Sequence, residues 1–319
     1  MKNRKHVYFL AFTFGLQNAR ASEHLVDTSY QADKRLVKYQ QTNPQLHRPQ
    51  IRFLQGQTVE FNLTYKKIGQ RWLTLDVFHP YQVARNSSKA INLIVMLHGG
   101  GWRTGDKTLM YPLANRLAQQ GYMVVVPEYR LSIEARYPAA IDDLVAAINW
   151  ANIRANQTHD EVKTILLGGS SGGHLASFIG LASNDLHRLK DKLTANIDGI
   201  VNLDGLLSTV TTEAVKFEDR RKENSALALW LGGSYQQKSE LWRQVSPANY
   251  LDKDDPDLLV ISSGQSRFTA GKELFLQRDK QSPVDFDYIQ LNEVEHTFWL
   301  FEPYLSDITP PIIRFLNKR

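Results

Sequence analysis

The sequence predicts a single α/β domain whose mostly parallel sheet is covered by helices on both faces. Short, continuous apolar runs, typical of strands buried on both faces, alternate along the chain with segments of helical spacing. Two segments of alternating apolar and polar residues precede them and predict an antiparallel hairpin at the start of the sheet. Near the middle, a glycine-rich turn joins one apolar run directly to a helix, which is the strand–turn–helix unit of such sheets.

The first half of the chain supplies the hairpin and the first parallel strands. Residues 59–65 and 72–78 carry the alternating pattern, and Ile68-Gly69-Gln70 separates them. Ile91–Leu97 is a continuous apolar run, and helical spacing over Leu109–Gln120 ends at Gly121. The other elements expected in this half are a short helix over 32–40, a strand over 122–126 and a helix over 139–155.

The second half continues the alternation of strands and helices. Residues 206–250 are mostly amphipathic and helical, and we expect them to lean over the strand ends as a partial lid. The remaining predicted strands are Ile197–Leu203, Asp257–Ser263 and Phe286–Leu291, and the remaining predicted helices are Ala270–Lys280 and Pro310–Asn317.

The N-terminus has the composition of a signal peptide. A basic stretch precedes an apolar run from Val7 to Leu16, and Ala19-Arg20-Ala21 resembles a cleavage site before Ser22. The apolar run is too short for a stop-transfer helix, so we expect a secreted or periplasmic protein without a membrane span in the mature chain. A retained N-terminal membrane anchor is the alternative. The chain is thus divided into a signal peptide (1–21), an extension (22–55) and one domain (56–319).

Charge and cysteine content exclude some classes of function. The formal net charge is +5, but the predicted signal peptide carries four basic residues and no acidic one, which leaves the mature chain near +1. No stretch of clustered Lys and Arg predicts nucleic-acid binding. The chain has no cysteine, so neither a thiol nucleophile nor a disulfide is available.

The glycine-rich turn is a candidate nucleophile site. An apolar run ends in Gly168-Gly169-Ser170-Ser171-Gly172-Gly173, which satisfies the pattern G-x-S-x-G in two registers, on Ser170 or on Ser171. In such an elbow a strained turn exposes the serine hydroxyl at the end of the sheet. We favour Ser170, because it follows the last glycines of the strand and leaves Ser171 to begin the helix. The backbone N–H of Ser171 could then point at a developing oxyanion.

Four motifs together resemble the α/β-hydrolase esterases. They are His98-Gly99-Gly100-Gly101-Trp102, Tyr129-Arg130-Leu131, Tyr137-Pro138-Ala139-Ala140 and the elbow through Ala176, in the order and spacing of that family. The nearest branch is the one similar to hormone-sensitive lipase and to feruloyl and acetyl-xylan esterases. The resemblance covers roughly residues 70–300 and implies the α/β-hydrolase fold and carboxylic-ester hydrolysis without a metal or organic cofactor.

The resemblance also implies roles for single residues. His296 lies where the family places its general base, and the family's usual alanine after the nucleophile favours Ser170 over Ser171. Gly99 and Gly100, with Gly101 as the alternative, would supply oxyanion-hole N–H groups, because glycine lets the backbone approach a substrate oxygen closely.

The sequence departs from the family at the acid of the triad. The family usually carries an aspartate where this chain reads Ser263-Gly264-Gln265-Ser266-Arg267, and a cation cannot stabilise an imidazolium. We expect Asp204 to be the acid instead, since it ends the strand that follows the nucleophile's strand and keeps the chain order Ser, Asp, His. Asp204 could alternatively cap a helix, and Asp287, Glu293 and Glu295 are the other candidate acids.

The substrate is less defined by the sequence. Trp102 beside the oxyanion loop and Trp299 after His296 could line an apolar or sugar-stacking pocket, or could be ordinary core residues. We expect short-chain, aryl or carbohydrate-linked esters as substrates. The alternatives are an amide hydrolase acting on formamides and, because of Arg267, a non-catalytic binding protein on the same scaffold.

Overall fold

A computed structural model describes residues 27–81, 90–279, 285–292 and 294–318. The predicted signal peptide and its cleavage site lie outside these residues. The strands form one eight-stranded sheet in the order β1-β2-β4-β3-β5-β6-β7-β8. Their bounds are β1 Val59–Ile68, β2 Arg71–Phe78, β3 Ile91–Leu97, β4 Met123–Pro127, β5 Val162–Gly169, β6 Gly199–Leu203, β7 Asp257–Ser262 and β8 Phe286–Gln290.

The sheet is antiparallel at its start and parallel elsewhere. β1 pairs with β2, and β2 with β4, in antiparallel fashion, whereas every pair from β4 to β8 is parallel. The predicted hairpin and mostly parallel sheet are therefore confirmed. Because all parallel strands run the same way, the residues that follow β3, β5, β6 and β7 meet at one edge.

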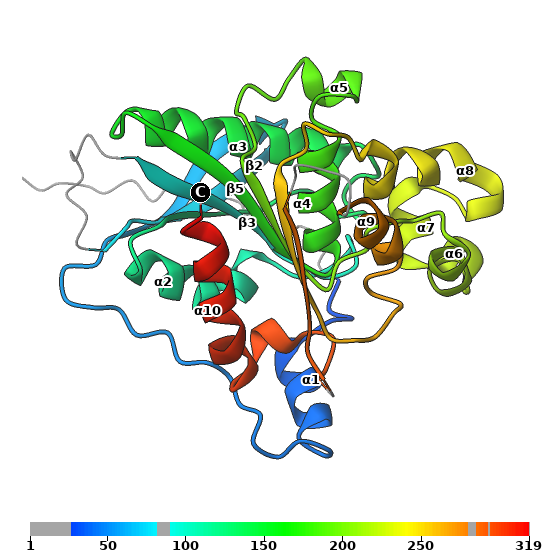
Figure 1. The fold of residues 1–319 in the computed structure, drawn as a ribbon, viewed down its shortest axis with the longest axis horizontal. Coiled ribbons are helices and arrows are strands. Elements are labelled where there is room, and N and C mark those ends of the chain that lie inside the picture. Colours follow the sequence, from blue (N-terminus) through cyan, green and yellow to red (C-terminus); the bar gives the residue numbers. More distant parts are fainter. Residues whose placement is uncertain (1–26, 82–89, 280–284, 293, 319) are drawn as a thin grey trace, which may run out of the picture.

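Helices cover both faces of the sheet, as Figure 1 shows. α2 and α10 pack on one face, against side chains such as Ile94 and Met96 of β3, whereas α3 and α4 pack on the other, against Leu93 and Val95. Each face buries its own apolar cluster, which is why the parallel strands are mostly apolar. The principal helices are α1 Ala32–Tyr39, α2 Tyr111–Gln119, α3 Ala139–Asn156, α4 Ser171–Leu181, α5 His187–Lys190, α6 Thr212–Glu218, α7 Ala226–Leu231, α8 Tyr235–Gln244, α9 Lys272–Asp279 and α10 Tyr304–Leu316.

The last helix begins earlier than the sequence predicted. The sequence predicts this helix over Pro310–Asn317. Instead α10 begins at Tyr304 and holds both Pro310 and Pro311 in its interior. The buried stripe from Leu305 to Phe315 explains this, since its packing outweighs the two missing N–H donors.

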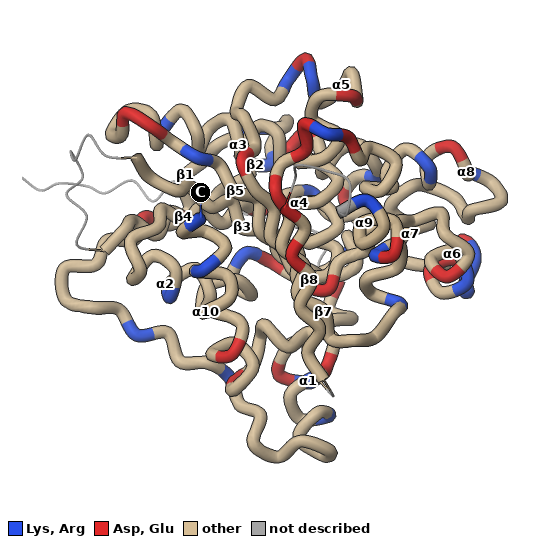
Figure 2. The backbone as a smooth tube through the Cα atoms, viewed as in Figure 1, with Lys and Arg blue, Asp and Glu red and all other residues tan. Residues whose placement is uncertain are grey.

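The N-terminal extension is anchored to the C-terminal part of the domain. His47 forms an isolated antiparallel bridge with Glu302, and α1 packs with Tyr39 edge-on to Phe301. Figure 1 shows α1 beside the lower end of α10. Figure 2 shows Lys and Arg interspersed with Asp and Glu around the fold. None of the helices in the described ranges combines the length and apolar character needed to cross a bilayer.

Candidate active site

The turn between β5 and α4 places Ser170 in a strained conformation. Its φ of 54° and ψ of −122° lie outside the regions that L-residues ordinarily adopt, while Ser171 is the first residue of α4. The turn is closed by backbone contact: a Cβ on Gly172 would lie 2.2 Å from the carbonyl oxygen of Leu97. The glycines therefore let α4 approach β3, and the side chain of Ser170 is left at the edge of the sheet.

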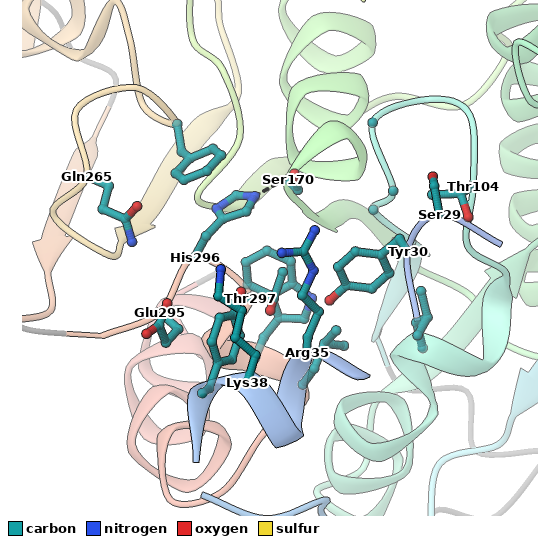
Figure 3. A pocket seen from close by; sticks show the side chains of 18 of the residues that line it. Ser29, Tyr30, Arg35, Lys38, Thr104, Ser170, Gln265, Glu295, His296 and Thr297 are labelled. Atoms are coloured by element: carbon teal, nitrogen blue, oxygen red, sulfur yellow. Dashed lines mark hydrogen bonds between the residues drawn. The ribbon is translucent and has the colours of Figure 1, made fainter. Parts of the chain in front are cut away.

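Ser170 begins a chain of hydrogen bonds through His296 to Asp204. The Oγ of Ser170 lies 2.8 Å from Nε2 of His296, and Nδ1 of His296 lies 2.7 Å from Oδ2 of Asp204. Figure 3 shows the contact between the serine and the imidazole. With Nδ1 donating to the carboxylate, Nε2 is free to accept the serine proton.

Asp204 is buried and fixed by the end of the neighbouring strand. It follows β6 with a φ of 55° and is 1% exposed. The backbone N–H of Ser263 donates to its Oδ1 at 3.0 Å, and the hydroxyl of Ser263 donates to Oδ2 at 2.6 Å. It caps no helix, because Thr211 caps the next one, α6. A buried carboxylate held in place by these donors can orient an imidazole.

The loop after β3 lies directly against the turn that carries Ser170. A Cβ on Gly99 would lie 2.6 Å from the carbonyl oxygen of Gly169 and 3.1 Å from Cβ of Ser170, so only glycine permits this approach. Within the described part of the chain, the N–H groups of Gly99, Gly100 and Ser171 meet no hydrogen-bond acceptor. Unsatisfied N–H groups beside a nucleophile are the arrangement that an oxyanion hole requires.

Tyr129 holds this glycine loop in place. Its ring stacks on His98 with the centroids 4.5 Å apart, and its hydroxyl donates to the carbonyl oxygen of His98 at 2.7 Å. Arg130 next to it forms an ion pair at 2.7 Å with the buried Asp143 of α3. The second motif of the sequence thus serves to position the first.

Two cavities meet at Ser170. The larger, of about 500 Å³, includes Gly99, Gly100 and His296 in its wall. The smaller, of about 80 Å³, is lined by Trp102, Ser171 and Leu206 among others. In the part of the chain that the structure describes, no group of three or more His, Asp or Glu side chains could hold a metal ion.

Comparison with protein-family models identifies the family of this chain. Residues 75–268, more than half of the chain, match the BD-FAE family model, and this range contains the oxyanion loop, Ser170 and Asp204. The chain belongs to the BD-FAE family.

Relatives and solved structures of similar fold are known. The chain is 26% identical over 243 residues to esterase LipC of Mycobacterium tuberculosis, covering 72% of this chain and 59% of LipC. It is 36% identical over 106 residues to carboxylesterase 20 of Arabidopsis thaliana, covering 31% of this chain and 32% of that protein. The chain thus spans less than two thirds of the length of these curated relatives.

Among solved structures, esterase 2 of Thermogutta terrifontis in its apo form superimposes with a TM-score of 0.65 at 19% identity, covering 85% of this chain and 96% of that one. A truncated carbohydrate esterase from gut microbiota gives a TM-score of 0.65 at 21% identity, covering 84% and 99%. These similarities establish the α/β-hydrolase fold.

Arg267, where the BD-FAE chain departs from the expected acid, forms an ion pair with Glu218. Its side chain is 43% exposed, lies 3.4 Å from Oε1 of Glu218 and passes over the ring of Phe268. Phe268 in turn stacks face to face on His296, with centroids 3.3 Å apart. The cation thus approaches His296 only across a phenyl ring.

Neither Asp287 nor Glu295 forms a hydrogen bond with the imidazole. Asp287 lies in β8, is half-exposed and forms an ion pair with Lys318 at 3.3 Å. Glu295 lines the larger cavity but forms no hydrogen bond to His296. Glu293 lies outside the described residues.

The pKa of His296 lies below its ordinary value of 6.5, chiefly because burial disfavours the imidazolium. Asp204 opposes this shift by its hydrogen bond and charge, whereas Arg267 and Arg35 add to it by repulsion. Burial also lowers the pKa of His174 to about 4, so this histidine is neutral and its Nε2–H donates to the carbonyl oxygen of Val245 at 2.8 Å. His174 therefore has a structural role.

The two tryptophans named from the sequence line the cavities from within the core. Trp102 is 4% exposed, stacks on Trp230 at 5.4 Å and lines the smaller cavity. Trp299 is 3% exposed, contacts His296 edge-on at 5.6 Å and lines the larger one. Both are packing residues that also form part of a cavity wall.

Sequence reasoning missed two groups of site residues. Ser263 holds Asp204 in place, and it lies in the segment where the family usually carries its acid. Its position directly after β7 could have indicated that its side chain lies at the same edge of the sheet as Asp204. Tyr30, Arg35 and Lys38 of the N-terminal extension line the larger cavity, and a short amphipathic helix carries no signal for such a partner.

Proposed function

We propose that this protein is a serine esterase that hydrolyses carboxylic esters of small acyl groups through an acyl-enzyme intermediate. The hydrogen-bonded chain Ser170–His296–Asp204 is the observation that carries the proposal. Membership of the BD-FAE family and the esterase names of LipC and its counterparts support it.

Each residue of the chain has a defined task. His296 Nε2 takes the proton of Ser170 as Oγ bonds to the ester carbonyl carbon, and Asp204 stabilises the resulting imidazolium. The N–H groups of Gly99, Gly100 and Ser171 hold the negative oxygen of the tetrahedral intermediate. His296 then gives the proton to the leaving alcohol oxygen as the C–O bond breaks. A water, deprotonated by the same nitrogen, releases the acid and restores Ser170.

Each of the two cavities binds one part of the ester. The leaving alcohol must receive its proton from His296, and this histidine lines the larger cavity but not the smaller one. The alcohol therefore occupies the larger cavity and the acyl group the smaller. A space of about 80 Å³, closed by Trp102, Leu206 and Ala226, fits an acetyl or similarly short acyl chain.

The test is labelling with a fluorophosphonate probe together with hydrolysis of p-nitrophenyl acetate. We expect Ser170→Ala to abolish labelling and to lower kcat by about 10⁶, as the loss of a triad nucleophile does. Ser171→Ala is the matched control: it keeps the backbone N–H and should still be labelled. Labelling that survives in Ser170→Ala but vanishes in Ser171→Ala would refute the assignment. An unlabelled, inactive wild type would identify a non-catalytic binding protein, and turnover of formamides alone would identify an amide hydrolase.

A further inference from the structure

One wall of the larger cavity comes from the N-terminal extension. Tyr30, Arg35 and Lys38 line it opposite His296 and Ser170. Figure 3 shows the side chains of Arg35 and Lys38 directed from α1 toward this pair. The segment is fastened next to the oxyanion loop, because Asp27 forms an ion pair with Arg103 at 2.5 Å and its carbonyl oxygen accepts the hydroxyl of Thr104.

The cavity wall carries an excess of positive charge. Four cationic side chains line it, against one carboxylate, that of Glu295; the cations are Arg35, Lys38, Arg103 and Arg267. Arg103 and Arg267 are compensated by ion pairs with Asp27 and Glu218 respectively.

Among the described residues, Arg35 and Lys38 have no such partner. No carboxylate of the described residues, Glu295 included, lies within ion-pair distance of either side chain. The Arg35 guanidinium lies over the ring of Tyr30, 5.6 Å from the centroid. Arg35 is half-buried and Lys38 exposed, so the two cations extend from the mouth of the cavity toward its interior.

Cations that lie beside a nucleophile, with no carboxylate partner among the described residues, attract anionic ligands into the cavity. A cleft lined by one sign of charge concentrates ligands of the opposite sign, and a guanidinium and an ammonium together suit an anionic oxygen group. Arg35 also adds, by repulsion, to the lowering of the pKa of His296, which is consistent with its place in the same cavity wall.

We infer that the leaving alcohol of the natural substrate carries a carboxylate, and that Arg35 and Lys38 select it. This inference rests on the proposed function, because it takes the larger cavity as the site of the alcohol. The preferred substrate is then a short-chain acyl ester of an acidic alcohol, for instance of a hydroxy acid or an acidic sugar.

The test compares 3-acetoxybenzoate with phenyl acetate, each kcat/KM divided by the rate constant of hydroxide-catalysed hydrolysis. The wild type should prefer the anionic ester. Arg35→Gln and Lys38→Gln should each lower the preference about tenfold, the scale of a charge-assisted hydrogen bond at a partly solvated site. The preference should also fall as salt is raised to 0.5 M, because ions screen exposed charges.

A matched control is available on the same helix. Lys34 of α1 is exposed and lies outside the cavity wall, so Lys34→Gln removes the same charge from the same helix. It should leave the preference within about twofold, since charges beyond the site are screened. Arg35→Glu should reverse the selection and favour 3-acetoxy-N,N,N-trimethylanilinium. If Arg35→Gln fails to fold, Lys38→Gln and the salt dependence of the preference still test the inference.

Failure of this inference is distinct from failure of the proposed function. Hydrolysis of phenyl acetate with a preference that neither Arg35→Gln nor Lys38→Gln changes would overturn the inference and leave the esterase intact. If the wild type hydrolyses neither ester, the esterase proposal fails, and calorimetry still tests the anion site. In that case tighter binding of 3-hydroxybenzoate than of 3-hydroxybenzyl alcohol, weakened by Arg35→Gln, supports the site, and equal binding overturns it.

Discussion

Replacing Asp204 by asparagine should separate the orientation of the imidazole from the fold. The backbone N–H of Ser263 is a fixed donor and must keep an acceptor, so the amide oxygen of asparagine would take the place of Oδ1. The amide NH₂ would then face Nδ1 of His296, where the carboxylate now lies at 2.7 Å. Nδ1 would have to become the acceptor, which moves the ring proton to Nε2. In that tautomer His296 cannot accept the proton of Ser170.

The expected loss follows from this tautomer. Neutralising the orienting carboxylate of a Ser-His-Asp triad lowers kcat by about 10⁴, which is about 5.5 kcal/mol of barrier. The hydroxyl of Ser262 still donates to the oxygen in the place of Oδ1, and the hydroxyl of Ser263 can rotate to accept from the amide, so the melting temperature should change little. The assay is the steady-state hydrolysis of p-nitrophenyl acetate beside a thermal melt. A near-normal kcat in Asp204→Asn, with collapse in Asp287→Asn or Glu295→Gln, would refute the assignment.

Three further outcomes are expected. Burial and cationic neighbours hold the pKa of His296 below 6.5, so the acid limb of the kcat/KM profile should lie below that pH. Arg267→Gln removes one repulsion and raises this pKa, so the acid limb should move to higher pH. A pH profile measured with a neutral ester checks this. Leu206→Ala enlarges the smaller cavity and should raise kcat/KM for p-nitrophenyl hexanoate relative to acetate about tenfold, and an unchanged ratio would contradict the assignment of that cavity to the acyl group. We also propose export with cleavage after Ala21, so the intact mass of the secreted protein should begin at Ser22, whereas a full-length membrane-bound product would indicate an anchor.

The predicted parts of the fold are those where burial leaves a periodic pattern. β3 and β5 are mostly apolar because both faces of the sheet are covered, and the alternating sequence of β1 and β2 correctly predicted the antiparallel hairpin. α10 shows the limit of local patterns: the sequence predicted a helix from Pro310, but the buried stripe that packs on the sheet extends the helix back to Tyr304.

Some residues of the site were likewise predictable from the sequence and others were not. Ser170 and the glycines of the oxyanion loop were predictable, because a tight turn needs particular residue types in a fixed order. Asp204 was reached by topology, since neighbouring parallel strands end at one edge. Arg35 and Lys38 were not predictable, because their place depends on where α1 docks, and nothing in a short helix encodes a partner so distant in the sequence.

The docking of α1 has a consequence for how activity arises during folding. The larger cavity takes one wall from α1, near the start of the described chain, and another from the loop of His296, near its end. Contacts between segments so far apart in sequence carry a high loop-closure cost and form late. A chain whose sheet has formed but whose two ends have not met would have Ser170 and lack a complete substrate site. Regain of selectivity for the anionic ester on refolding would therefore time the meeting of the two ends, separately from formation of the sheet.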